Sequence, residues 1–211
     1  RRFPGRADGH APDRVAHAFL ADVAGAAQVV DLRGAHPAFR QVPQARVQTG
    51  QAEALERALV CNARVVWQRD ESTVGSLADA LPGLVTLEGG VGNRLTEGVG
   101  MELSDGVMNL LAVMGVLPEE DLPFHWAAIQ RPLVVSDDRV LAVRAGRGGL
   151  FLPATTVWAE VEEGQTTGEV VDPVTGEVRE NVVAPRAGRV LALREQPVVY
   201  PGNLLVRLGA A

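Results

Sequence analysis

The sequence contains no lysine, because all twenty of its basic residues are arginine. This absence excludes chemistry that needs a lysine amine: a Schiff base to a carbonyl substrate or to pyridoxal phosphate, a P-loop phosphate site, and the attachment point of a lipoyl or biotin carrier. A genomic preference for arginine codons explains the bias, and the exclusion holds whatever its cause.

Cysteine, basic clusters and long apolar runs are also scarce. The single cysteine, Cys61, cannot form an internal disulfide, which favours a reducing compartment. No signal-peptide pattern and no apolar run of membrane-spanning length appear in the given sequence. The net charge of -6, without any run of basic residues, argues against a nucleic-acid or acidic-membrane surface. We therefore expect a cytoplasmic protein that binds neither nucleic acid nor membrane.

The first half of the chain alternates between helical and strand-like patterns. Short apolar runs predict strands at 28–32, 64–67 and 84–87, and apolar spacings of three and four predict helices at 12–24, 51–60, 73–81 and 96–114. We expect Leu55 and Leu59 to be buried, Ser72 to cap the third helix, and residues 33–50 to form an ordered loop over the sheet edge. The alternation predicts an α/β fold with a mostly parallel sheet and helices on both faces.

Beyond Pro118 the pattern changes to short β-branched or alternating runs, at 125–129, 139–143, 167–171 and 188–193. Glycine, proline and aspartate turns separate them, and the stretch 172–176 is typical of a hairpin turn. We place a domain boundary near 118–130. This predicts a partial α/β domain at 1–120 and a small all-β barrel or sandwich at 121–211.

Two of the predicted strands end in an acid that is followed by glycine. Asp31 precedes Gly34, and Glu88 precedes Gly89. Active sites of α/β sheets lie at the carboxyl ends of their strands, so both acids are candidate site residues. Each also has a structural interpretation: Glu88 as a solvated acid beside a glycine turn, and Asp31 as a cap for loop amides.

Motifs in order along the chain resemble the succinylglutamate desuccinylase/aspartoacylase family. Arg1-Arg2-Phe3-Pro4-Gly5 looks like the end of that family's Asn-Arg-x-Phe-Pro-Gly, Val30-Asp31-Leu32-Arg33-Gly34 like its Asp-Leu-His strand end, and Val85-Thr86-Leu87-Glu88-Gly89 like its Thr-x-Glu-x-Gly. The stretch 149–204 is similar to the lipoyl-like β domain that closes over the family's site. The resemblance implies a zinc carboxypeptidase-like α/β fold with a mostly parallel, mixed sheet. It also implies a zinc-dependent hydrolase that cleaves the amide bond of an N-acyl amino acid or similar small acyl compound.

The resemblance also implies roles for individual residues. Glu88 matches the general base, Arg1 matches the arginine that binds the substrate carboxylate, and Asp31 matches an acid that flanks the metal. The family holds zinc with a His-x-x-Glu pair and with the histidine of Asp-Leu-His. From the residues themselves, Arg94 is a second candidate for a substrate anion, with a surface salt bridge as the alternative.

The sequence departs from the family's metal site in two places. It has no His-x-x-Glu, because none of its histidines (His10, His17, His36 and His125) has Glu three residues later. That motif precedes Asn-Arg-x-Phe-Pro-Gly in the family, so we expect the N-terminal part of the catalytic domain to be missing. Arg33 takes the place of the third ligand, and a guanidinium offers no lone pair and repels zinc. His36 could replace it only with a rebuilt loop.

Two hypotheses follow for the function. The first is a zinc-dependent deacylase with Glu88 as general base. The second is a catalytically degenerate relative that binds a carboxylate or a partner protein, in which Arg33 supplies the charge of the metal and also binds the substrate carboxylate. The sequence leaves open the acyl group, the amine and any homo-oligomer.

Overall fold

The computed structural model describes residues 2–70, 74–121 and 131–210. Its helices are α1 (Ala11–Asp22), α2 (Ala52–Leu59), α3 (Leu77–Ala80) and α4 (Glu97–Val113), with short 3-10 turns at Glu119–Asp121 and Asp137–Arg139. Its strands are β1 (Val30–Gly34), β2 (Phe39–Gln48), β3 (Val65–Arg69), β4 (Val85–Val91), β5 (Leu133–Ser136), β6 (Val140–Arg144), β7 (Gly149–Pro153), β8 (Glu160–Val161), β9 (Thr166–Val171), β10 (Val178–Val183), β11 (Gly188–Arg194), β12 (Val198–Val199) and β13 (Leu204–Gly209).

No helix among the described residues is both long and apolar enough to cross a membrane. The cytoplasmic location stays a prediction.

The first five strands form a mixed sheet in the order β1-β4-β2-β3-β5. The pairs β1–β4, β2–β3 and β3–β5 are parallel, and only β2–β4 is antiparallel. The expected mixed α/β sheet is therefore confirmed. Parallel pairs predominate only among these five strands, whereas the strands that extend the sheet further pair in antiparallel fashion.

The loop predicted for residues 33–50 is wrong, because most of it is β2, a ten-residue strand that pairs with β4, β3 and β11. Its polar residues and Pro43 obscured the strand pattern. Pairing with β4 is irregular between Gln41 and Gln44, which leaves room for Pro43 in the ladder. Beyond this bulge the side chains alternate, with Ala45 and Val47 packed under the helices.

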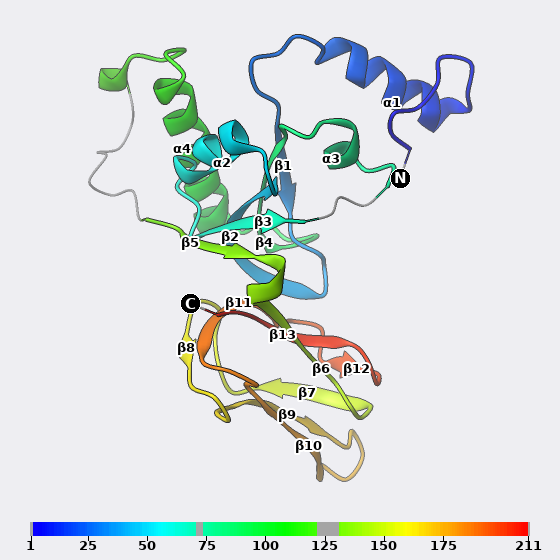
Figure 1. Ribbon diagram of the computed structural model, residues 1–211. Helices are drawn as coiled ribbons and strands as arrows, with labels where there is room; N and C mark the ends of the chain where they lie inside the picture. The colour runs from blue at the N-terminus through cyan, green and yellow to red at the C-terminus, as the bar shows by residue number, and fades with distance from the viewer. Residues whose placement is uncertain (1, 71–73, 122–130, 211) are drawn as a thin grey trace.

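Helices α2 and α4 cover one face of this sheet (Figure 1). Ala54 and Ala58 are the buried residues of α2, whereas Leu59 is 37% exposed and Leu55 only partly buried. The prediction that leucines form the buried face is wrong because small alanines let the helix approach the strands closely. Likewise the cap of α3 is Ser76, whose Oγ accepts from the Asp79 amide, while Ser72 lies outside the described residues.

The opposite face of the sheet is not covered by α2 or α4. Its buried residues include Val65 and Trp67 of β3, and Val157 and Trp158 from the segment before β8 pack against them. Helix α1 stands away from this face, at the end of the molecule far from β9 and β10 (Figure 1). The expectation that helices cover both faces is therefore wrong, because α2 and α4 both lie on the same face. The segment that contains Val157 and Trp158 covers part of the other face instead.

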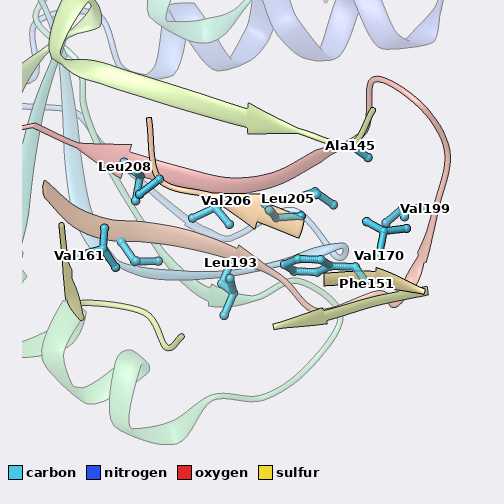
Figure 2. Close-up of a cluster of buried hydrophobic side chains, with 12 residues drawn as sticks. Ala145, Phe151, Val161, Val170, Leu193, Val199, Leu205, Val206 and Leu208 are labelled. Atoms are coloured by element: carbon cyan, nitrogen blue, oxygen red, sulfur yellow. The ribbon is translucent and has the colours of Figure 1, made fainter. Parts of the chain in front are cut away.

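The strands after residue 131 divide between two sheets. β11 pairs with β2 and with β13, so β11, β13 and β6 extend the first sheet, while β10-β9-β7-β12 form a second one. Figure 2 shows Phe151 and Val170 of the second sheet packed near Leu205 of β13. The predicted hairpin turn is confirmed, with the Asp172 amide donating to the Glu177 carbonyl. Most of the expected domain boundary lies outside the described residues.

Candidate functional site

A polar pocket of about 400 Å³ lies against the sheet face that α2 and α4 leave uncovered. We call it the Glu88 pocket; it is lined by Arg33, Gly34, Ala35, His36, Phe39, Gln41, Arg46, Glu88 and Arg207. It brings together three residues singled out from the sequence, Arg33, His36 and Glu88. It adds Gln41, Arg46 and Arg207, which the sequence did not single out.

Strand register explains why these side chains meet. Arg33 of β1 lies opposite Glu88 of β4, and Glu88 lies opposite Gln44 of β2. Two residues along β2, Arg46 lies opposite Trp67 of β3. Residues directly opposite each other in a sheet, and those two apart on one strand, project from the same face. The pleat thus gathers a carboxylate, two guanidinium groups, an amide and an indole on one face.

Glu88 lies inside β4 rather than at its end, because the strand continues through Gly89 and Gly90 to Val91. Its side chain is 8% exposed, and Oε1 accepts a hydrogen bond from Arg46 Nη2 at 3.1 Å. A buried carboxylate with an arginine partner does not fit the interpretation as a solvated acid beside a turn.

Arg46 is held on three sides. The side-chain oxygen of Gln44, with its amide oriented to satisfy its neighbours, accepts from Arg46 Nη2 at 2.7 Å and from Nε at 3.1 Å. The guanidinium carbon lies 5.1 Å from the ring centroid of Trp67. Burial lowers the pKa of Arg46, and the Glu88 carboxylate opposes this shift. Arg46 therefore fixes the orientation of Glu88.

Arg33 and Asp31 form an ion pair on the same face of β1. The Arg33 side chain is 47% exposed and reaches the pocket, whereas Asp31 is not among the residues that line it. The role of Asp31 beside a metal stays a prediction, and in this structure its carboxylate balances the charge of Arg33.

His36 does not present a metal-binding nitrogen. Its Nδ1 accepts a hydrogen bond from the Ala38 amide at 3.1 Å, and its ring packs on Phe39. In a neutral imidazole with Nδ1 as acceptor, the proton sits on Nε2, so neither nitrogen has a free lone pair. Metal-binding histidines usually donate from the second nitrogen, which is the reverse arrangement.

The described residues do not fit a zinc ion. Within the described part of the chain, no three His, Cys, Asp or Glu side chains are grouped so that they could hold a metal. The pocket instead places three guanidinium groups, Arg33, Arg46 and Arg207, around a single carboxylate. Such a set of donors favours an anion and repels a cation.

Of the two other predicted anion-binding residues only Arg94 is described, and it does not line the Glu88 pocket. Arg1 lies outside the described residues. The Arg94 side chain is 66% exposed, and its Nη1 lies 3.5 Å from Glu195 Oε2. Arg94 lines a largely apolar pocket of about 440 Å³ beside α4, which shares Arg33 and Gly34 with the Glu88 pocket. The ion pair with Glu195 agrees with the alternative interpretation of Arg94 as part of a surface salt bridge.

Several solved structures are similar to this chain over its whole length. The apo form of the ectoine utilization protein EutE (DoeB) from Ruegeria pomeroyi superposes with a TM-score of 0.84 at 23% identity, over 100% of this chain and 69% of that chain. A succinylglutamate desuccinylase from Silicibacter sp. TM1040 gives 0.80 at 23% identity, over 100% and 66%. An aspartoacylase family protein from Mesorhizobium loti gives 0.77 at 18% identity, over 100% and 66%.

These matches establish the fold. The chain spans about two thirds of the length of the structures that it matches. Neither the scan of protein-family models nor the search of curated proteins finds a match to the sequence. The resemblance to the succinylglutamate desuccinylase/aspartoacylase family, first indicated by short motifs, is therefore confirmed at the level of three-dimensional structure.

Proposed function

We propose, from a fold shared with succinylglutamate desuccinylase/aspartoacylase family proteins, that this chain provides the substrate-binding and proton-transfer groups of a deacylase. Its substrate class is an N-acyl amino acid or a similar small acyl compound with a carboxylate. The observation that carries the proposal is Glu88, a buried carboxylate fixed by Arg46 at the wall of a pocket rich in arginine. The pocket of about 400 Å³ suits a ligand of that size.

The side chains of the pocket divide the chemistry between them. Guanidinium groups bind a ligand carboxylate through paired N–H donors. Glu88 accepts the proton of an attacking water and passes it to the leaving amine, which is the role of a general base and then of a general acid. Arg46 keeps the carboxylate of Glu88 in one orientation during both steps.

The zinc ion that the resemblance implies has no step in this chemistry. Arg33, the proton on His36 Nε2 and the surplus of guanidinium groups do not suit a divalent cation. Zinc dependence of the whole activity therefore stays a prediction from the family resemblance alone.

A second candidate function is carboxylate binding without hydrolysis. The observation that favours it is Arg33, which stands where the family has a metal ligand and faces Glu88 across the β1–β4 pair. In this function the guanidinium groups hold an anion, and Glu88 only balances the charge of Arg46.

A hydrolysis assay combined with a binding assay separates the two functions. We expect the purified protein to bind N-acetylglycinate and to release acetate from it, measured by calorimetry and by an enzyme-coupled acetate assay, with and without added zinc. Binding without acetate release under either condition would favour the second function. Absence of both would contradict both proposals.

Replacing Arg33 with His should raise zinc affinity at least tenfold, because the change removes a cation and places an imidazole opposite Glu88. Titration against a chromophoric chelator measures the affinity. Arg94→His is the matched control, since Arg94 lies outside the Glu88 pocket. Equal zinc affinity in the two variants would show that Arg33 is not what keeps the metal out.

We also propose that the strands after residue 131 belong to a C-terminal all-β domain at 121–211 of the lipoyl-like barrel or sandwich type. The second sheet, β10-β9-β7-β12, and the apolar cluster between it and β13 support this assignment. The pairing of β11 with β2 means that this domain would share a sheet with residues 1–120.

A further inference from the structure

Arg207 comes from β13, far along the chain from the other residues of the Glu88 pocket. Gln41 of β2 lies opposite Ala192 of β11, and Ala192 lies opposite Arg207 of β13. The three residues therefore form one row on one face of the sheet. Ala192, with only a methyl group in the middle of the row, leaves the long Arg207 side chain a path across β11 to the pocket that it lines.

Three arginines near Arg207 have acidic partners: Arg33 has Asp31, Arg46 has Glu88, and Arg69 has Asp137 at 2.8 Å. Arg207 differs, because no described residue forms a hydrogen bond or an ion pair with it. Its one described contact of this kind is stacking, with the guanidinium carbon 5.1 Å from the ring centroid of Trp67. Its five N–H donors, which lie in the guanidinium plane, therefore have no partner among the described residues.

The surroundings of Arg207 make its charge unfavourable unless an anion binds to it. Burial, and then the charge of Arg46, lower the pKa of Arg207 to about 10, although the Glu88 carboxylate opposes this shift, so the group is still charged at neutral pH. A partly buried charge without a partner is unfavourable, and an anion that hydrogen-bonds to it recovers the lost solvation. Contact with the Trp67 ring limits the positions of the guanidinium, and its planar fork of donors favours a planar ligand group that accepts two parallel hydrogen bonds.

We propose that Arg207 binds the carboxylate of the ligand in the Glu88 pocket. The inference rests on the proposed function and deepens it, because it assigns the carboxylate to one guanidinium and makes β13 part of the binding site. Arg46 and Arg33 then serve other needs: Arg46 orients Glu88, and Arg33 is shared with Asp31.

The test compares N-acetylglycinate with N-acetylglycinamide, which has the same shape but no carboxylate. Calorimetry, with the quenching of tryptophan fluorescence as a second readout, should show that the wild-type protein prefers the carboxylate at least tenfold. Arg207→Gln should raise the Kd for N-acetylglycinate by about 10- to 100-fold and leave that for the amide within about twofold. Arg207→Lys should fall between the two, since it keeps the charge and loses the planar fork.

Arg189→Gln is the matched control. Arg189 also stacks on a tryptophan, Trp158 at 4.8 Å, but it pairs with Glu160 and lies outside the Glu88 pocket. It should bind both compounds as the wild type does. If Arg207→Gln misfolds by circular dichroism, Arg207→Lys decides the question alone.

The outcomes separate this inference from the proposed function. Unchanged carboxylate preference in folded Arg207→Gln and Arg207→Lys would overturn the role of Arg207, whereas hydrolysis by the wild type would still support a deacylase. Arg207-dependent binding without any hydrolysis would support Arg207 and contradict the deacylase. A wild-type protein that does not discriminate between the two compounds would contradict both.

Discussion

Replacing Glu88 with Gln should reduce acetate release from N-acetylglycinate about a thousandfold, within the usual range for loss of a general base. The amide of Gln is nearly isosteric and can still accept a hydrogen bond from Arg46, so the pocket should keep its shape. Gln cannot take a proton from water. Steady-state kinetics should therefore show the loss in kcat rather than in KM.

A second readout distinguishes a catalytic role of Glu88 from a structural one. Removing its negative charge leaves the neighbouring guanidinium groups less balanced, so N-acetylglycinate should bind the variant a few times more tightly. Glu102→Gln is the matched control, because Glu102 pairs with Arg64 at 2.9 Å and does not line the pocket. Equal activity of the Glu88 and Glu102 variants would rule out Glu88 as the base.

Replacing Gly106 with Ala should lower the free energy of unfolding by about 2 to 3 kcal/mol, the scale of overpacking in a close-packed interior. Gly106 lies in α4 where that helix crosses the end of α2, and an added Cβ would come within 1.9 Å of the Cys61 carbonyl oxygen. Next to this contact, Asn109 is fully buried and donates to the Val60 carbonyl at 2.5 Å. Urea denaturation followed by circular dichroism measures the change.

Gly100→Ala is the control for the intrinsic effect of the substitution. Gly100 lies in the same helix, and an added Cβ there would meet no atom of a neighbouring element within 4 Å. The variant should therefore gain up to about 1 kcal/mol from the higher helix propensity of alanine. Two variants of similar stability would mean that α4 can move away from Cys61 at little cost.

The candidate site was partly predictable from sequence. An apolar run, an acid and a following glycine pointed to Glu88 and to the Arg33 segment, and the structure brings Glu88 and Arg33 together across the β1–β4 pair. Arg46 was missed because Pro37, Pro43 and Gly50, with few apolar residues between them, are typical of a loop. The sign of this strand was the alternation of Gln44 and Arg46 with Ala45 and Val47, since one face of β2 is polar.

Local sequence by itself determined the helices, the strands β1, β3, β4, β6, β9 and β11, and the chemistry that a lysine-free chain cannot perform. Those features depend on residue type and on spacings of a few positions. The tertiary structure alone decided that Glu88 is buried against Arg46 and that Arg207 enters the same pocket. These depend on strand register between segments far apart in the chain, as with Arg207, which no local pattern in a single sequence encodes.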